Sequence, residues 1–211
     1  TTHQVRSEIV NRILLERVTQ LHSRVRQSRD ELARLNVQLQ VALEQSNELA
    51  SYDPLTNALN RRAFLERILE QKAAMQRHAR PAAIVLIDLD RFKAINDTYG
   101  HAVGDRVLGH CSTALRGQMR PGDVFARWGG EEFIVLLPDT TVADAAAIAE
   151  RYRITLTEST AEDWPHGLRV SASFGVADLD GASSFHEAVS AADLALYQAK
   201  AEGRNLIRVA G

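Results

Sequence analysis

The first 50 residues contain neither proline nor glycine and are rich in Glu, Arg, Gln and Leu, a composition that favours helix. Apolar residues recur with a seven-residue repeat, and Ser28 and Ser46 alone interrupt it. The repeat consists of Val18, Leu21, Val25, Leu32, Leu35, Leu39, Ala42 and Leu49. A narrow stripe of this period predicts a left-handed coiled coil, most simply a parallel dimer. One long amphipathic helix packed on its own domain is the alternative.

Composition places the rest of the chain among folded proteins. The 211 residues are 45% hydrophobic and 25% charged, which suits one ordinary domain beside the helical segment. We therefore expect a coiled-coil segment over residues 1–50 and a globular domain over residues 51–211. The net charge of −2 offers no basic excess, so neither nucleic acid nor a membrane surface is expected as a partner.

Three further features concern the setting of the protein. No apolar run reaches the about 18 residues that a membrane-spanning helix needs. The single cysteine, Cys111, excludes an internal disulfide, and we expect it to be a buried core residue of a cytoplasmic protein. The chain begins on Thr1 and not on methionine, so we expect it to be part of a longer protein with an upstream sensor domain.

Strand and helix patterns alternate after Asp53-Pro54, where proline ends the N-terminal helix. An amphipathic helix follows, with an expected inner face of Phe64, Leu65, Ile68 and Leu69. The apolar run Ala82–Ile87 predicts a buried central strand. Further strands are expected over 168–176 and 205–209, and further helices over 143–159 and 184–201, the first of these helices capped by Asp139 or Thr140. This alternation predicts an α/β (α+β) sandwich with a mixed central sheet.

Gly129 and Gly130 stand between two β-prone runs, which predicts a hairpin whose tight turn needs positive φ at one or both glycines. Two carboxylates, Glu131 and Glu132, follow directly. The bare backbone of glycine lets a ligand approach closely, and carboxylates can hold a hard cation beside it. The stretch therefore predicts either a site for a metal-bound phosphate or an ordinary hairpin with two solvated glutamates.

Asp88 ends the expected central strand and can neighbour Glu131 in one sheet. Carboxylates that converge repel one another unless a divalent cation lies between them, and magnesium leaves coordination positions open for phosphate oxygens. Lys93, with Lys200 and Arg204 on one helix face, would add positive charge around a triphosphate. Each of these residues alone is equally compatible with a solvated surface position.

Asn96 and Asp105 are candidates for a base-binding pocket. A carboxylate accepts hydrogen bonds from the ring N–H and the exocyclic amine of guanine, whereas adenine presents a lone pair at the ring position. Asp105 would therefore favour guanine. Helix capping by both residues is the alternative, since Asn and Asp often serve as caps.

Taken together, these motifs resemble the GGDEF family of diguanylate cyclases, with Glu in place of the first acidic residue of the signature. The resemblance covers Asp53 to about Val209. It is carried, in order, by Asp53-Pro54-Leu55-Thr56, Asp88-Leu89-Asp90-Arg91-Phe92-Lys93, Asn96-Asp97-Thr98-Tyr99-Gly100-His101, Gly104-Asp105, Gly129-Gly130-Glu131-Glu132-Phe133, Ser173-Phe174-Gly175 and Tyr197-Gln198-Ala199-Lys200 through Gly203-Arg204-Asn205. Asn57 and Ala58 depart from the usual Gly and Leu, and Asn tolerates the positive φ that this turn needs.

The resemblance implies a sheet similar to the palm of nucleotidyl cyclases and the conversion of two GTP molecules into cyclic di-GMP and two pyrophosphates. It implies that magnesium, with manganese possible, is bound by Asp88, the carbonyl of Leu89 and Glu131. Glu131, with Glu132 beside it, would help remove the proton of the attacking 3′-hydroxyl, and Lys93 would stabilise the transition state. The implied substrate contacts are Phe92, Asn96, Asp105, Gly129, Gly130, Lys200 and Arg204.

Arg120-Pro121-Gly122-Asp123 resembles the Arg-x-x-Asp motif at which cyclic di-GMP inhibits members of this family, and it lies at the same distance from the signature. Arg151 resembles a secondary arginine of that site. Arginine can bind the O6 and N7 atoms of guanine with two hydrogen bonds. A surface ion pair at a turn is the alternative interpretation.

One chain would hold one GTP, so a cyclic product requires two subunits that face each other, and the coiled coil would make that homodimer. We also expect Asp53, at the end of the helix, to pair with Arg127 beside the hairpin. A module that keeps the fold but only binds GTP or cyclic di-GMP as a sensor is the competing hypothesis. Such modules typically lose part of the acidic set, which is complete here.

Overall fold

The computed structural model describes residues 17, 20–29, 31–40, 51–78, 80–162, 164–179, 182 and 184–211, with the backbone alone over 71–78. The chain divides into two compact units, Thr1–Leu49 and Ala50–Gly211. Each is considered by itself.

The described part of the first unit, residues 20–29 and 31–40, is helical. Its expected seam residues, Leu21, Val25, Leu32, Leu35 and Leu39, are 55–65% exposed in the single chain. A stripe of large apolar side chains facing solvent is what one strand of a coiled coil presents. Val18, Ala42, Ser46 and Leu49 of the same repeat lie outside the described residues. No helix within the described part of the chain is long and apolar enough to cross a membrane.

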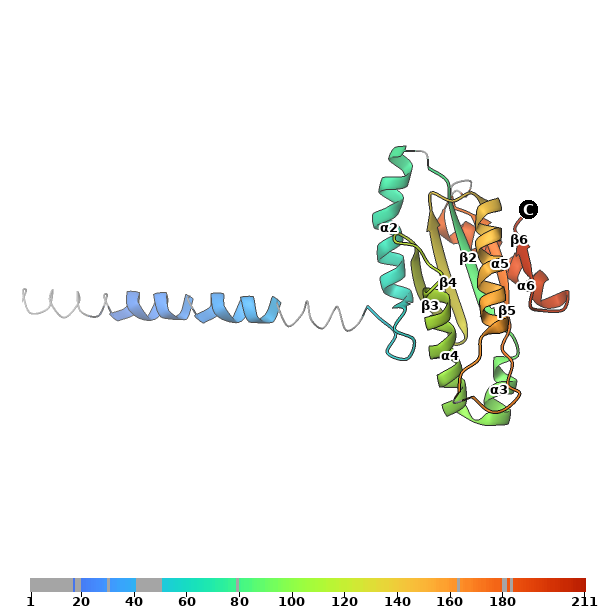
Figure 1. Ribbon diagram of the computed structural model, residues 1–211. Coiled ribbons are helices and arrows are strands. Elements are labelled where there is room, and N and C mark those ends of the chain that lie inside the picture. The colour runs from blue at the N-terminus through green and yellow to red at the C-terminus, as the bar shows by residue number, and fades with distance from the viewer. Residues whose placement is uncertain are drawn as a thin grey trace, which may run out of the picture. The chain divides into compact units, whose positions relative to one another are not determined.

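The second unit is built on a six-stranded sheet in the order β1-β3-β4-β2-β5-β6 (Figure 1). The strands are β1 (Leu59–Asn60), β2 (Ala82–Leu89), β3 (Val124–Gly129), β4 (Glu132–Pro138), β5 (Ala172–Asp178) and β6 (Ile207–Val209). The four central strands pair antiparallel, whereas β1 joins β3 and β6 joins β5 in parallel. The sheet is therefore mixed, as the sequence predicts.

Helices cover both faces of this sheet, which gives the predicted α/β sandwich (Figure 1). On one face, α2 (Arg61–His78) and α6 (Phe185–Ala201) contribute Phe64, Ile68, Ala192 and Leu196 to a core with Ile84 and Ile134. On the other face lie α3 (Phe92–Tyr99), α4 (His101–Arg116) and α5 (Val142–Glu158). The core on this face contains Val107, Tyr152 and Cys111, which is buried as predicted.

Strand β2 is the centre of the sheet and positions the site. All eight of its residues are buried, and successive side chains enter opposite cores. At its C-terminal end Asp88 lies opposite Glu132 of β4 and Ser173 of β5. Helix α6 packs very closely on the neighbouring strand β5, where a Cβ on Gly175 would lie 2.0 Å from the carbonyl oxygen of Ala192.

Several local expectations were wrong. Leu65 and Leu69 are 36% and 71% exposed, because the part of α2 whose side chains are described packs on the sheet through Ala63, Phe64 and Ile68. Thr141 caps α5 by accepting a hydrogen bond from the Asp144 amide. Asp139 has a left-handed φ of 52° and belongs to the preceding turn.

Two strands are also shorter than expected. Residues 168–171 precede β5, whose pairing with β2 begins at Ala172. Leu168 and Val170 are nevertheless buried in the core, which explains the period-two pattern of the sequence. The last strand begins at Ile207 and not at Asn205, because Asn205 has a left-handed φ of 48°.

Candidate active site

The signature hairpin joins β3 and β4 through a turn at Gly130 and Glu131, one residue later than expected. The register shifts between Arg127 and Gly129, so that Gly129 lies opposite Glu132. Such a bulge adds one residue and extra twist to its strand. Neither Gly129 nor Gly130 has a positive φ, contrary to the expectation for a tight turn. Asn57, in contrast, has the predicted left-handed conformation, with φ of 52°.

The side chain of Arg127 holds the turn in place. Its Nε and Nη2 atoms donate hydrogen bonds of 3.0 and 2.7 Å to the carbonyl oxygen of Gly130. Its Nη1 atom forms the predicted ion pair with Asp53, at 3.1 and 3.0 Å from the two carboxylate oxygens. Burial acts to raise the pKa of Asp53, but hydrogen bonds from Thr56 and the charge of Arg127 outweigh it and leave the pKa below its usual value.

The two glycines of the signature differ in how much space the domain leaves for a side chain. A Cβ on Gly129 would lie 3.1 Å from Oε2 of Glu132, which is tight. A Cβ on Gly130 would meet nothing within 4 Å. Neither backbone conformation nor packing within the domain requires glycine at position 130, so the space above it is open to a ligand.

Three carboxylates, those of Asp88, Glu131 and Glu132, lie near enough beside the turn to influence one another electrostatically. Asp88 lies opposite Glu132 in the sheet, and the Leu89 amide donates to the Glu131 carbonyl at 3.3 Å, which brings the turn to the end of β2. Burial raises the pKa of Asp88, as do the charges of Glu131 and Asp90, although Lys200 opposes them from 2.8 Å. Burial and the charge of Asp88 likewise raise the pKa of Glu132. The cluster holds more negative charge than Lys200 balances.

These residues fit a divalent cation. Among the described residues no three His, Cys, Asp or Glu side chains are grouped closely enough to hold a metal ion by themselves. The predicted set, Asp88, Glu131 and the Leu89 carbonyl, has only two carboxylates. Magnesium commonly binds through one or two carboxylates and takes its other ligands from water and phosphate. Repulsion within the cluster is what such an ion relieves.

Beside the cluster lies a cavity of about 460 Å³ between the hairpin, α3 and α4. It is lined by Phe92, Lys93, Asn96, Asp97, His101, Asp105, Leu108, Arg127, Gly130 and Glu131. Six predicted site residues from four separate motifs thus share one cavity. Gly104 leaves room for the Asn96 side chain as it stands, since a Cβ there would lie 1.9 Å from Oδ1 of Asn96.

Comparison with known proteins identifies the family of the domain. Residues 50–206 match the family described as "Diguanylate cyclase, GGDEF domain". The chain belongs to the GGDEF family. It is 40% identical over 169 residues to diguanylate cyclase DgcM of Escherichia coli, covering 79% of this chain and 40% of that protein. It is 42% identical over 170 residues to the response regulator PleD of Caulobacter vibrioides, covering 78% and 37% respectively. The chain therefore spans about two fifths of the length of these curated relatives.

A solved structure with the same architecture is the coiled coil and GGDEF domain of DgcB from Caulobacter crescentus, in complex with c-di-GMP. It is 29% identical to this chain with a TM-score of 0.76, and the match covers 90% of this chain and 99% of that one. The likeness therefore includes a coiled-coil segment as well as the GGDEF domain.

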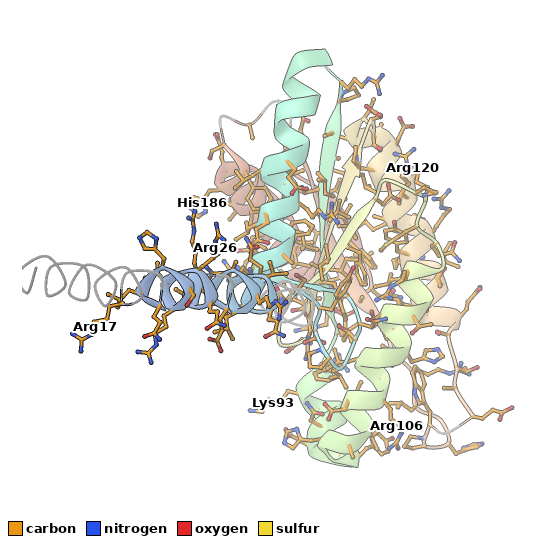
Figure 2. The ribbon with its side chains drawn as sticks, turned by 90° about the vertical axis from the view of Figure 1, so that its left-hand side faces the viewer. Arg17, Arg26, Lys93, Arg106, Arg120 and His186 are labelled. Atoms are coloured by element: carbon orange, nitrogen blue, oxygen red, sulfur yellow. The ribbon has the colours of Figure 1, made fainter. Side chains whose placement is uncertain are left out.

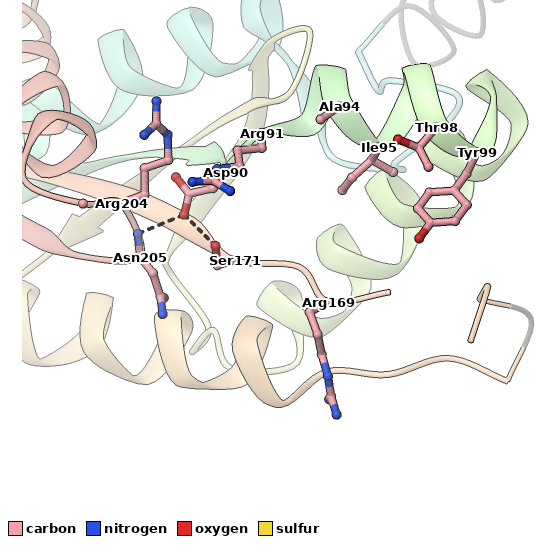
Figure 3. Close-up of a pocket in the computed structure, with 11 residues that line it drawn as sticks. Asp90, Arg91, Ala94, Ile95, Thr98, Tyr99, Arg169, Ser171, Arg204 and Asn205 are labelled. Carbon is pink, nitrogen blue, oxygen red and sulfur yellow. Dashed lines mark hydrogen bonds between the residues drawn. The ribbon is translucent and has the colours of Figure 1, made fainter. Parts of the chain in front are cut away.

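One predicted phosphate contact of the GGDEF domain lies elsewhere. Helix α6 ends at Ala201, so Lys200 and Arg204 do not share a helix face as expected. Lys200 contacts Asp88, whereas Arg204, with φ of 66°, lines a separate cavity of about 400 Å³ on the other side of α3 (Figure 3).

The Arg-x-x-Asp motif forms a turn with internal contacts. The Arg120 Nε donates to Asp123 at 3.2 Å, and its Nη2 binds the Pro138 carbonyl at 2.8 Å and the Thr140 hydroxyl. Both motif residues line a cavity of about 590 Å³ that shares no lining residue with the base cavity. Figure 2 shows Lys93 and Arg120 in separate parts of the domain. Arg151 is exposed and does not line this cavity.

Sequence reasoning missed two residues around these sites. Arg116 lines the Arg120 cavity and binds the carbonyls of Thr56 and Asn57, so it ties the turn after Asp53 to α4. Asp90 is buried and accepts hydrogen bonds from Ser171, Ser173 and the Asn205 amide. Asp90 directly follows β2, and its spacing of two from Asp88 was the available signal, because residues at that spacing in extended chain share a face.

Proposed function

We propose that this chain is a diguanylate cyclase that condenses two GTP molecules into cyclic di-GMP and releases two pyrophosphates. The observation that carries the proposal is the shared cavity of Lys93, Asn96, Asp105 and Glu131, directly beside the carboxylate cluster of Asp88. The E. coli relative is named a diguanylate cyclase, and the C. crescentus structure contains c-di-GMP.

The base end of the cavity accounts for a preference for guanine. Asp105 accepts hydrogen bonds from the ring N–H and the amine of guanine, and the Asn96 amide completes the polar edge. Phe92 provides an apolar wall. Adenine would leave the Asp105 carboxylate facing a lone pair, and an unsatisfied contact of this kind strongly disfavours the wrong substrate.

The phosphate end lies toward the hairpin. The open space over Gly130, together with Gly129, lets phosphate oxygens approach the backbone, and Lys93 and Lys200 offset their charge. Arg204 is exposed in the turn after α6 and would add a further positive charge by turning toward the phosphates. Asp88, Glu131 and the Leu89 carbonyl would hold magnesium or manganese, which supplies charge neutralisation at the phosphates.

The chemistry is an in-line phosphoryl transfer in which positioning and electrostatics provide most of the acceleration. The 3′-oxygen of one GTP forms a bond to the α-phosphorus of the other, and the bond to pyrophosphate breaks. Glu131 accepts the proton of the 3′-hydroxyl, with Glu132 maintaining the negative potential around it. The same step repeated in the opposite direction closes the ring.

Because the described part of the domain forms one base cavity of this kind, two domains must face each other. We propose that the apolar stripe from Leu21 to Leu39 pairs with a second copy in a parallel coiled coil. We further propose that cyclic di-GMP inhibits the enzyme at Arg120 and Asp123, with Arg151 as a second contact. A separate cavity at that turn supports this assignment.

Incubation of the protein with GTP and magnesium tests the proposal, with cyclic di-GMP and pyrophosphate measured by chromatography. We expect one cyclic di-GMP for two pyrophosphates, and none with Glu131→Gln. GTP binding without turnover by a verified dimer would instead identify a sensor module.

A further inference from the structure

The cavity that holds Arg204 is separate from the base cavity. Its volume is about 400 Å³, and it lies between the second face of α3, the segment before β5 and the loop that joins α6 to β6 (Figure 3). The two cavities share no lining residue and have α3 as their common wall. Volumes of this size accommodate small molecules.

Three arginines line this cavity from three different segments: Arg91, Arg169 and Arg204. Figure 3 shows Arg204 and Arg169 on opposite sides, with Arg91 between them and with the side chains of Arg204 and Arg169 extending in opposite directions. None of the three guanidinium groups has a hydrogen bond or an ion pair with any other residue that the structure describes. Arg80, Arg127 and Arg153, in contrast, are each paired with a carboxylate. The three arginines are exposed and can turn toward a bound molecule.

The acidic residue in the lining does not balance this charge. The Asp90 carboxylate already accepts hydrogen bonds from the Ser171 hydroxyl at 2.7 Å, the Ser173 hydroxyl at 2.6 Å and the Asn205 amide at 2.9 Å. Two of these bonds are drawn in Figure 3. With three donors on a buried carboxylate, the arginines leave the cavity with an excess of positive charge.

The wall of the cavity is held in an uncommon backbone conformation. Arg91, Arg204 and Asn205 have left-handed φ values of 55°, 66° and 48°. Non-glycine residues in this region are held there by their surroundings and cluster at binding sites. Here the Asp90 network fixes Asn205, so the strained loop is anchored to the buried end of β2.

We propose that this cavity is a second anion site, which binds a small phosphorylated molecule through Arg91, Arg169 and Arg204. Phosphate oxygens accept the paired donors of arginine better than any other common anionic group except carboxylate. Ile95 and the half-exposed ring of Tyr99 give the rest of the ligand an apolar surface. A phosphomonoester with a ring, such as a nucleoside monophosphate, uses both parts, whereas pyrophosphate uses the arginines alone.

Helix α3 connects this site to the base cavity. Its residues Ala94, Ile95 and Thr98 face the anion site, whereas Lys93 and Asn96 face the base. A ligand that fixes Arg204 also withholds it from the GTP phosphates. Occupancy is therefore expected to raise KM for GTP, a consequence that rests on the proposed cyclase function.

Isothermal titration with AMP and with pyrophosphate, in magnesium-free buffer without GTP, tests the site directly. We expect at least one of the two to bind, and Arg169→Ala to weaken that binding about tenfold or more, in line with the loss of a charged hydrogen bond. Arg62→Ala, an exposed arginine of α2, should leave the binding unchanged. Circular dichroism confirms that both variants fold.

Which probe binds separates the two sources of phosphate: AMP stands for an independent effector and pyrophosphate for the reaction product. No binding of either probe, or equal binding by Arg169→Ala, would overturn the proposal. A second readout is KM for GTP with and without the bound probe, in wild type and in Arg169→Ala. Failure of catalysis would leave the titration interpretable, so the two proposals can fail separately.

Discussion

The Arg127 guanidinium holds both carboxylate oxygens of Asp53, at 3.0 and 3.1 Å, while its remaining nitrogens hold the Gly130 carbonyl. One side chain thus connects the start of the globular domain to the turn that carries Glu131. The pair is largely shielded, with side chains 20% and 17% exposed. A displacement of the residues around Asp53 would therefore move the turn that carries Glu131 and change the geometry of the carboxylate cluster.

This relationship predicts a strong energetic coupling. In a double-mutant cycle with Asp53→Ala and Arg127→Ala, we expect a coupling energy of about 1–3 kcal/mol in denaturant unfolding, as for contacting residues in one network. The exposed pair Arg62 and Glu66 on α2 serves as the control, with an expected coupling of about 0.3–0.5 kcal/mol. Equal coupling in both cycles would refute a special role for Arg127.

The carboxylate cluster predicts a pH-dependent gain in stability from Glu132→Gln. Burial and Asp88 raise the pKa of Glu132 above its ordinary 4.5, so the folded state binds this proton more tightly than the unfolded state. The stabilising contribution of Glu132 is present below pH 4.5 and is lost as pH rises through the folded pKa. Glu132→Gln should therefore raise Tm at pH 7 to 8, with the gain vanishing toward pH 4.

Glu150→Gln is the matched control with the opposite sign. A hydrogen bond from Arg153 lowers the pKa of Glu150, so its contribution is present above the ordinary pKa and is lost as pH falls through the folded value. This variant should lose stability at neutral pH and recover it in acid. Tm of both variants and of the wild type is measured from pH 4 to 8. If the Tm differences from wild type changed with pH in the same direction for both variants, the assignment of the cluster would be contradicted.

Much of the fold and site followed from sequence because the informative signals are local. The apolar run of β2, the alternation of elements and the short motifs fixed the sheet class and the residues of the base cavity. The exposure of Leu69 and the capping of α5 by Thr141 were not predicted, because the packing of α2 and the turn at Asp139 depend on distant segments.

The failure at Arg204 has the same origin. The i, i+4 spacing from Lys200 predicts a shared helix face, but α6 ends at Ala201. Asp90, 115 residues earlier in the chain, then binds the Asn205 amide and holds the loop in its left-handed conformation. No local pattern announces such a contact, nor the one-residue shift of the hairpin turn that the bulge before Gly129 causes.

Asp105 predicts the base specificity. Asp105→Asn should raise KM for GTP about 10- to 100-fold, since a charged hydrogen bond to a substrate contributes about 1.5–3 kcal/mol, and it should narrow the preference for GTP over ATP. Asp97→Asn is the control, because Asp97 lines the same cavity without an assigned contact to the base. Steady-state kinetics with both nucleotides measure the effect, and an equal change in the two variants would point to general electrostatics.

Arg120 predicts product inhibition. Arg120→Ala should weaken binding of cyclic di-GMP by at least about tenfold, the loss expected for a bidentate arginine–guanine contact, with little change in the initial rate. Arg80→Ala is a suitable control, because Arg80 pairs with Asp139 at the neighbouring turn and does not line the cavity. An unaltered inhibition curve for Arg120→Ala would exclude this turn as the inhibitory site.

The heptad pattern of the N-terminal helix predicts which helix face forms the dimer and so brings the two active sites together. Leu35 lies on the heptad seam and Val37 does not, yet the two are 55% and 60% exposed in the single chain. Leu35→Asp would bury a charge in the seam, so we expect a monomer by light scattering and an activity at least about tenfold lower at dilute protein, recovering as concentration restores the dimer by mass action. Val37→Asp should keep both the dimer and the activity, because an off-seam carboxylate stays in water. If both variants became monomeric by light scattering and lost activity to the same extent, the helices would meet through a different face. The seam would then not be the contact that aligns Glu131 of one subunit with the substrate of the other.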